Sequence, residues 1–321
     1  MKLLEVKRLT TKLYTSKGIV TPVDNVSFNL DRGEILGLVG ESGCGKSMTS
    51  MSIMGLLDKS LSEVTGEVLF NGVNLLNLSK EQMNEYRGSK IAMIFQDVMT
   101  SLNPLMKIGE QIMEPLMAHK KMTKEEARKE AVRLLDAVGI LASDKRVNEY
   151  PNSLSGGMRQ RVMIAIALSC NPDVLVADEP TTALDVTIQA QILELMKKIR
   201  DEYGTSIIMI SHDIGVISSM CDKAAVMYCG SIVEQGSIEH IFNNPVHPYT
   251  KGLMQCIPRL DTSTDVLYNI PGIVPPLYGL PDECKYATRC NKCAEICKGK
   301  NPEFVEIENG HLVRCMRCYN E

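Results

Sequence analysis

The sequence predicts an α/β fold of the doubly wound type, with a β-rich layer before it and a small appendage after it. Two continuous apolar runs, 174–177 (VLVA) and 206–210 (SIIMI), are typical of parallel strands buried on both faces. A third run, 34–40 (EILGLVG), leads into a glycine-rich turn and a helix-forming segment, which is the strand, loop and helix order of this class. From about Pro245 onward, prolines and then cysteines crowd the chain, which predicts a separate loop-rich unit over 245–321.

The first part of the chain carries the signals of a β layer. Val26, Phe28 and Leu30 alternate with polar residues, as in a strand with one buried face. Asn71-Gly72 lies between two apolar stretches and is a hairpin signal, because both residues accept the positive φ of a tight turn. The segment after Lys46 has the composition of a helix that only Gly55 would stop.

Between about 97 and 170 the pattern becomes helical. Thr123 and Glu126 have the spacing of a capping box, which marks the start of a helix. The apolar face of this helix precedes Gly139 and consists of Ala127, Ala131, Leu134, Leu135 and Val138. We therefore expect a main domain over 1–244 that contains a helical subdomain at about 97–170.

The composition limits the classes of function. A chain of 321 residues with 44% hydrophobic and 23% charged residues can bury an ordinary core, so disorder is not expected. A net charge of -4 offers no broad basic face, and we expect no nucleic-acid partner. The apolar runs are far shorter than the roughly 18 residues that cross a bilayer, and the first residues do not resemble a signal peptide. The sequence therefore predicts a cytoplasmic location.

The glycine-rich turn after the third apolar run fits a phosphate-binding loop. Gly40, Gly45, Lys46 and Ser47 have the spacing G-x-x-x-x-G-K-S, with a strand before and a helix after. Glycines let several N–H groups point at phosphate oxygens, the lysine reaches the β and γ phosphates, and the serine can bind Mg²⁺. A plain glycine-rich loop is the alternative. Cys44, near the helix N-terminus, either gains reactivity through a lowered pKa or simply fills the loop.

Acidic and polar residues follow three of the predicted strands. Asp178 and Glu179 end the run 174–177, where Asp178 would hold Mg²⁺ through water and Glu179 would orient and deprotonate the attacking water. Gln96 and His212 follow other apolar runs, at positions suited to sensing a γ-phosphate. Each has a structural alternative, since an acidic pair can cap a helix and a lone Gln or His at a strand end is often only structural.

A second helix start has the features of a phosphate-binding end. Ser155, Gly156 and Gly157 precede an apolar helical stretch and would open it with exposed N–H groups. One nucleotide hardly needs two such ends from one chain. We infer that the second end serves the nucleotide of a neighbouring subunit.

Together these motifs resemble those of an ABC ATPase, a P-loop NTPase, in order and spacing over nearly the whole chain. The resemblance implies a head-to-tail dimer with ATP between the phosphate loop of one subunit and the LSGGM segment (154–158) of the other. It also implies that an aromatic residue in the β layer stacks on adenine. On this resemblance the nucleotide-binding residues are Tyr14, Gly40, Ser42, Gly43, Cys44, Gly45, Lys46, Ser47, Met48, Gln96, Asp178, Ser155, Gly156 and Gly157. The Mg²⁺ ligands are Ser47, Gln96 and Asp178, and the catalytic residues are Glu179, His212 and Gln96.

Several segments resemble the ATP-binding subunits of oligopeptide and dipeptide permeases. The signature ends in Met158 instead of the commoner glutamine, and 245–253 (PVHPYTKGL) is typical of this branch. The resemblance implies two transmembrane permease subunits, a second ATP-binding subunit, an extracellular peptide-binding protein, and a place at the cytoplasmic face of the membrane. Import of nickel or another small solute remains an alternative. A soluble ABC ATPase of DNA repair or translation is a further one, which the single motif set and the short spacing from Ser47 to Leu154 disfavour.

Six of the eleven cysteines lie between Cys284 and Cys318. Taken alone, the pairs Cys290-x-x-Cys293 and Cys315-x-x-Cys318 have nearly the spacing of a zinc ribbon. The resemblance to peptide permeases instead implies a [4Fe-4S] cluster, which thiolates also suit. Free thiols without a metal are the third possibility. The implied cluster ligands are Cys284, Cys290, Cys297 and Cys315.

Overall fold

The computed structural model describes residues 2–182, 184–256 and 268–319, and these form two compact units. One comprises 31–34 and 77–209, and we call it the helical unit. The other comprises 2–30, 35–76 and the described residues from 210 onward, and we call it the sheet unit. Residues 257–267 and 320–321 of the predicted appendage lie outside the described part of the chain.

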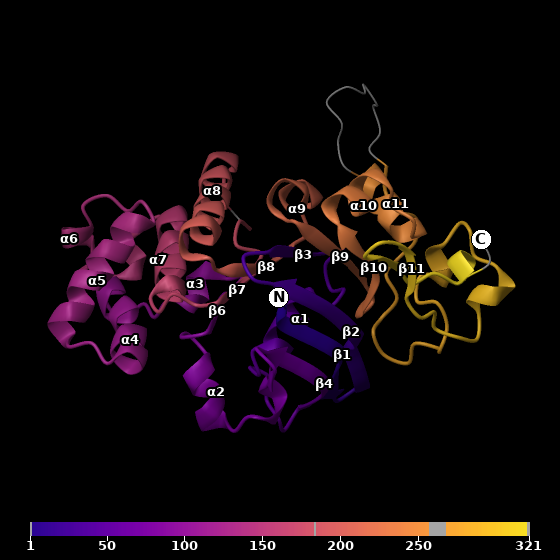
Figure 1. Cartoon of the computed structure of the whole chain (residues 1–321), viewed down its shortest axis with the longest axis horizontal. Helices are drawn as coiled ribbons and strands as arrows, with labels where there is room; N and C mark the ends of the chain where they lie inside the picture. The colour runs from indigo at the N-terminus through magenta and orange to yellow at the C-terminus, as the bar shows by residue number, and fades with distance from the viewer. Residues whose placement is uncertain (1, 183, 257–267, 320–321) are drawn as a thin grey trace. The chain divides into compact units, whose positions relative to one another are not determined.

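The sheet unit begins with an antiparallel sheet of order β2-β1-β4-β5, of which Figure 1 labels β2, β1 and β4. The predicted hairpin is confirmed, since β4 pairs with β5 and both turn residues have positive φ, 47° at Asn71 and 83° at Gly72. The alternation of Val26, Phe28 and Leu30 is also confirmed, because all three side chains are buried. The elements of this part are β1 (Lys2–Thr15), β2 (Gly18–Asp31), β3 (Ile35–Val39), α1 (Lys46–Ile53), β4 (Ser62–Phe70), β5 (Val73–Asn74) and the 3₁₀ turn η1 (Leu75–Asn77).

A second sheet of the same unit has the order β11-β12-β10-β9-β3. β3 pairs in parallel with β9, with Val39 beside Val226, whereas β10 runs antiparallel to β9 and β12. Because β12 extends this sheet, the cysteine-bearing tail is joined to it by backbone hydrogen bonds. Its elements are α9 (Ile214–Met220), β9 (Lys223–Tyr228), β10 (Ser231–Ser237), α10 (Ile238–Asn243), α11 (Pro248–Gln255), η3 (Ala287–Arg289), η4 (Glu295–Cys297), β11 (Val305–Glu308), β12 (His311–Val313) and η5 (Met316–Tyr319).

The helical unit combines short buried strands with a group of packed helices. β6 and β7 pair in parallel, and the strand order is β8-β7-β6. α4, α5 and α7 pack on one another, as the magenta part of Figure 1 shows. The elements are α2 (Lys80–Tyr86), β6 (Ile91–Ile94), α3 (Val98–Ser101), α4 (Ile108–Lys120), α5 (Lys124–Ala137), α6 (Ser143–Arg146), η2 (Pro151–Ser153), α7 (Gly156–Leu168), β7 (Val174–Asp178), α8 (Val186–Tyr203) and, from its first residues, β8 (Ser206–Ser211).

The local expectations for the helical unit are confirmed. The strand residues 174–177 and 207–209 are at most 1% exposed, as expected of strands covered on both faces. The capping box of α5 is present, with the amide of Glu126 donating to Thr123 and the amide of Thr123 donating to the Glu126 carboxylate. Of the helices in the described ranges, none combines the length and the apolar character that crossing a bilayer requires.

Candidate functional site

The glycine-rich loop 40–47 connects β3 with α1, as the sequence predicts. Its surroundings require glycine at two positions. A Cβ on Gly40 would lie 2.2 Å from the backbone oxygen of Met227, and a Cβ on Gly45 would lie 2.1 Å from that of Pro22. Gly45 also has a φ of 106°, which residues with a Cβ rarely adopt. The loop therefore keeps this shape only with glycine at both positions.

Lys46 begins α1 and is buried against the loop. Its Nζ donates to the carbonyl oxygen of Gly40 at 2.7 Å and to that of Glu41 at 3.2 Å. A compact ammonium group held at the backbone of such a loop suits a phosphate oxygen. Of the other predicted residues here, Gly40 and Gly45 are buried, Ser42 and Gly43 are exposed, and Ser47 and Met48 are half-buried.

Cys44 is the buried thiol of this loop, with only 1% of its surface exposed. Burial raises its pKa, and the nearby Lys46 acts in the opposite direction without overcoming that effect. A lowered pKa, which would have raised the reactivity of this thiol, is therefore not what the structure shows. Cys44 fills the loop.

Asp178 and Glu179 lie at the end of β7. Asp178 is buried, and Glu179 is half-buried with a φ of 47°, which is uncommon for a residue that has a Cβ. The Oε2 atom of Glu179 accepts two hydrogen bonds, from Nε2 of Gln96 at 3.0 Å and from Oγ1 of Thr182 at 2.8 Å. These bonds fix the direction in which the carboxylate points.

Strand pairing brings Gln96 to this carboxylate. β6 ends at Ile94 and lies beside β7, with Ile94 opposite Ala177. Parallel strands have their carboxyl ends at one edge of the sheet, so the residues that follow them meet there. The structure thus brings together Gln96, Asp178 and Glu179. Carboxylate and amide oxygens of this kind are suitable ligands for Mg²⁺.

Ser155 caps α7, as the sequence predicts. Its Oγ accepts a hydrogen bond from the amide of Met158 at 3.4 Å. A Cβ on Gly157 would lie 2.9 Å from a methyl group of Ile188, whereas a Cβ on Gly156 would meet nothing within 4 Å. The first turn of α7 therefore begins with small residues whose N–H groups can face an anion.

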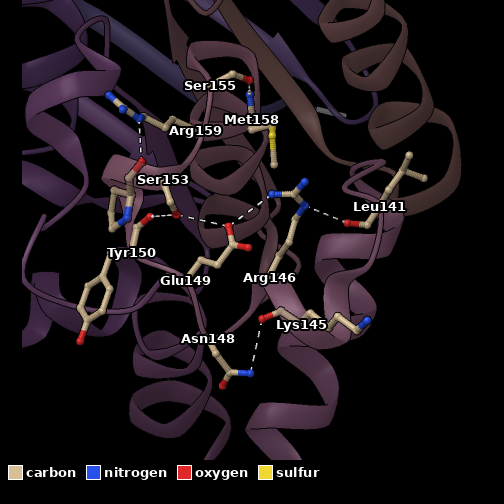
Figure 2. Close-up of polar contacts among 11 residues, drawn as sticks. Leu141, Lys145, Arg146, Asn148, Glu149, Tyr150, Ser153, Ser155, Met158 and Arg159 are labelled. Carbon is tan, nitrogen blue, oxygen red and sulfur yellow. Dashed lines mark hydrogen bonds and ion pairs between the residues drawn. The ribbon is translucent and has the colours of Figure 1, made fainter.

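Polar contacts hold the stretch before α7 in place (Figure 2). The carboxylate of Glu149 accepts from Nη1 of Arg146 at 3.3 Å and from Oγ of Ser153 at 3.2 Å. From inside α7, Nε of Arg159 donates to the backbone oxygen of Pro151 at 2.8 Å. These contacts connect α6, the turn η2 and the start of α7.

Two further predicted residues lie in the sheet unit. Tyr14 is in β1, is 48% exposed, and donates from its hydroxyl to the carboxylate of Glu63 at 3.0 Å. His212 directly follows β8 and is exposed. Each hydrogen bond described above between two predicted residues joins residues of the same unit. The sheet unit contains Tyr14, the loop 40–47 and His212, and the helical unit contains Gln96, Asp178, Glu179 and Ser155–Gly157.

The predicted cluster ligands share one neighbourhood of the sheet unit. The amide of Cys284 donates to the carbonyl oxygen of Cys297 at 3.1 Å. Burial raises the pKa of Cys284 to about 12, and the thiols of Cys297, Cys315 and Cys290 contribute to the rise. However, within 2–182, 184–256 and 268–319 no three His, Cys, Asp or Glu side chains lie close enough to hold a metal ion. The described arrangement therefore does not support the predicted iron–sulfur cluster or its zinc alternative.

Two residues that contact the loop 40–47 were not singled out from the sequence. The hydroxyl of Tyr249 accepts from the amide of Glu41 at 3.0 Å, and Arg289 forms an ion pair with the Glu41 carboxylate at 2.8 Å. They are 208 and 248 residues away from Glu41 along the chain. A local pattern cannot reveal such contacts, although both residues lie in stretches that the sequence singled out for other reasons.

Comparison with known proteins identifies two family models. Residues 23–182 match a model described as ABC transporter, and residues 233–297 match the oligopeptide/dipeptide transporter C-terminal region. The oligopeptide transport ATP-binding protein AppD of Bacillus subtilis is 49% identical over 314 residues, which cover 98% of this chain and 96% of that protein. OppD of Escherichia coli, described in the same words, is 49% identical over 99% of this chain and 94% of that protein. A solved dimeric post-hydrolysis state of an ATP-binding cassette with ADP and Pi has a TM-score of 0.66 at 30% identity, covering 73% of this chain and 98% of that one.

Proposed function

The chain belongs to the ABC transporter family, in the branch with the oligopeptide/dipeptide transporter C-terminal region, and from this premise we propose that it hydrolyses ATP to power the import of peptides. Its fold is that of an ABC ATPase cassette. The solute is inferred from the relatives, which are described as oligopeptide and dipeptide transport ATP-binding proteins. These descriptions favour peptides over the nickel alternative.

One observation supports the ATPase activity more than the others: the carboxylate of Glu179 is held in a fixed direction. A general base must point steadily at the water whose proton it takes, and the hydrogen bonds from Gln96 and Thr182 provide that. Asp178 would hold Mg²⁺ together with Ser47 and Gln96, and Glu179 would activate the water that attacks the γ-phosphate.

The remaining predicted residues have roles on the phosphates and on the base. Lys46 and the N–H groups of the loop 40–47 would bind the β and γ phosphates. His212 would contact the γ-phosphate, and Tyr14 would stack on adenine. Ser155, Gly156 and Gly157 would close the nucleotide site of a second subunit. Each chain then holds only parts of two sites, so hydrolysis is slow until a partner completes them.

The proposed partners follow from this function. ATP binding and hydrolysis would drive conformational changes in two transmembrane permease subunits. A second ATP-binding subunit, which is a copy or a related chain, would complete the nucleotide sites. An extracellular peptide-binding protein would supply the solute. The chain would lie at the cytoplasmic face of the membrane, with a nucleotide-binding domain at 1–244, helical at about 97–170, and a C-terminal domain at 245–321.

A [4Fe-4S] cluster is a separate part of the proposal, and no step of hydrolysis passes through it. Its support is the resemblance alone, because within the described ranges no three His, Cys, Asp or Glu side chains lie close enough to hold a metal ion. Anaerobic purification followed by iron, sulfide and zinc analysis tests it. About four irons and four sulfides per chain would support the cluster. One zinc per chain, or neither iron nor zinc, would contradict the proposed cluster.

The function is tested by uptake into right-side-out membrane vesicles that are loaded with ATP and contain the whole transporter. ATP-dependent accumulation of a labelled dipeptide or oligopeptide is expected, and Lys46→Ala should abolish it. Lys124→Ala, which changes an exposed lysine in α5, serves as the matched control and should retain uptake. Accumulation of labelled nickel without peptide would contradict the assigned solute, and full uptake with Lys46→Ala would contradict the assigned phosphate loop.

A further inference from the structure

The second residue of the phosphate loop is an acid. Glu41 directly follows Gly40, in a loop whose proposed task is to hold a polyphosphate. A carboxylate beside phosphates repels them, and the repulsion grows where solvent is partly excluded. An acidic side chain at this position therefore needs a cation, or it weakens nucleotide binding.

Arg289, from the cysteine-bearing part of the sheet unit, is that cation. Its Nη1 donates to Oε2 of Glu41 at 2.8 Å and its Nη2 donates to Oε1 at 3.1 Å. Two parallel bonds of this kind form the strongest and most directional pairing between a guanidinium and a carboxylate. The Arg289 side chain is 3% exposed and that of Glu41 is 30% exposed, so the pair is shielded on the arginine side.

Two backbone oxygens and an aromatic ring also hold the guanidinium in place. Nε donates to the backbone oxygen of Pro271 at 2.9 Å, and Nη2 also donates to that of Ile270 at 3.2 Å. The group lies over the ring of Tyr228, at 5.7 Å from its centroid. Arg289 is thus preorganised, and it needs no rearrangement to meet Glu41.

The backbone of Glu41 is held as well. Its amide donates to the hydroxyl of Tyr249 at 3.0 Å, and its carbonyl oxygen accepts from Lys46 at 3.2 Å. Main chain and side chain of this one residue are therefore contacted by the phosphate-binding lysine, by α11 and by the turn η3. The C-terminal part of the chain reaches the loop through Arg289 and Tyr249.

We propose that Arg289 is a positioning residue for ATP, which neutralises Glu41 in the phosphate loop, so that the C-terminal part of the chain takes part in nucleotide binding. The proposal rests on the phosphate-loop function proposed above. It assigns the cysteine-bearing segment a role in the ATPase cycle that does not depend on any metal.

The test is a double-mutant cycle on the full chain, read as the Kd for Mg-ATP by isothermal titration calorimetry. Arg289→Gln leaves the carboxylate unpaired and should raise the Kd about tenfold. Glu41→Gln removes the repelling charge and should not weaken binding. Glu41→Gln combined with Arg289→Gln should bring the Kd back to within about threefold of the wild type, which is a strong departure from additivity.

A purely structural role for Arg289 predicts the opposite pattern. In that case the double variant would bind ATP no better than Arg289→Gln alone, and this result would overturn the proposal, as would an unchanged Kd in Arg289→Gln. If Arg289→Gln does not fold, Arg289→Lys and the double variant are compared, and a double variant that binds at least tenfold more weakly than Arg289→Lys contradicts the proposal. Arg128→Gln, on the exposed face of α5, controls for the loss of one positive charge.

Lys46→Ala separates this inference from the function on which it depends. If Lys46→Ala leaves the Kd for ATP unchanged, the phosphate-loop assignment itself fails. If Lys46→Ala weakens binding and Arg289→Gln does not, only the role of Arg289 fails. The effect of Arg289→Gln should also be larger for ATP than for ADP, because the repulsion increases with the charge of the nucleotide.

Discussion

Glu179 combines an uncommon backbone conformation with a side chain held from two sides. A residue with a Cβ at a φ of 47° costs of order 1–3 kcal/mol when its ψ is also unfavourable, and it persists only where its surroundings enforce it. The hydrogen bonds from Gln96 and Thr182 then direct the carboxylate. Backbone and side chain together hold the carboxylate in one direction, which is what general base catalysis requires.

Replacing Glu179 should separate ATP binding from hydrolysis. Glu179→Gln keeps the size and the hydrogen-bonding shape, but the amide cannot take a proton. In the assembled transporter, single-turnover hydrolysis should fall on the order of 10²–10⁴-fold while the Kd for ATP stays the same. Glu194→Gln, an exposed residue of α8, is the matched control and should hydrolyse ATP normally. Brisk turnover by Glu179→Gln would show that another group is the base.

Tyr14 offers a test of how the base of the nucleotide is bound. Its ring is 48% exposed at the end of β1, so it is accessible to a ligand, and its hydroxyl is engaged by Glu63. If the ring stacks on adenine, Tyr14→Ala should weaken ATP binding by about 1–3 kcal/mol, in the range of base–aromatic stacking. Tyr14→Phe keeps the ring and should bind normally. Equal binding by Tyr14→Ala and Tyr14→Phe would identify this residue as plain surface packing of the β layer.

At the scale of elements, local rules predict the helix starts well. The capping box at Thr123 and the cap at Ser155 both form, because each depends on residues three positions apart. The helix after Lys46 also ends as expected, close to Gly55, which has a φ of 59°. The cap of α11 was not predicted: Nδ1 of His247 accepts from the amide of Tyr249 at 3.1 Å. Glu234, thirteen residues earlier in the chain, also holds His247, because its carboxylate accepts a hydrogen bond from the His247 amide.

This buried cap should make stability depend on pH. Burial lowers the pKa of His247 to about 4, although Glu234 partly opposes the effect, so the folded chain holds the imidazole neutral. In the unfolded chain the imidazole binds a proton near pH 6.5. The contribution of neutral His247 to the free energy of unfolding is therefore complete above that pH, and it is lost as the pH falls towards 4. The difference between the pKa of His247 in the unfolded and in the folded chain corresponds to about 3 kcal/mol of unfolding free energy.

Urea unfolding at pH 7 and pH 4.5 measures the effect. His247→Asn keeps a side chain that can cap α11 but does not titrate. The loss of unfolding free energy between the two pH values should be smaller in His247→Asn than in the wild type by on the order of 2 kcal/mol. An identical loss in both proteins would contradict the assignment of this acid sensitivity to His247.

At the scale of the whole molecule, motifs and strands were predictable, whereas contacts between distant segments were not. The buried strands and the loop 40–47 follow from composition and spacing, because each is a local property of ten or so residues. The Arg289–Glu41 pair joins residues 248 positions apart, and no periodicity encodes it. The cysteine spacing predicted a metal site, yet spacing alone does not determine how close the thiols of a loop-rich segment come. The same limit explains why Tyr249 was found only in the structure.

If this chain hydrolyses ATP in order to drive peptide import, the ATPase rate of the transporter that co-purifies with it must depend on peptide. The complex is captured through a tag on this chain and reconstituted into liposomes, and its rate is compared with that of the isolated chain, with and without peptide-loaded binding protein. We expect slow hydrolysis by the isolated chain and a rate several-fold higher in the complex when peptide is present. A rate that is the same for the isolated chain and the complex, and that does not respond to peptide, would show that ATP hydrolysis by this chain does not drive peptide import.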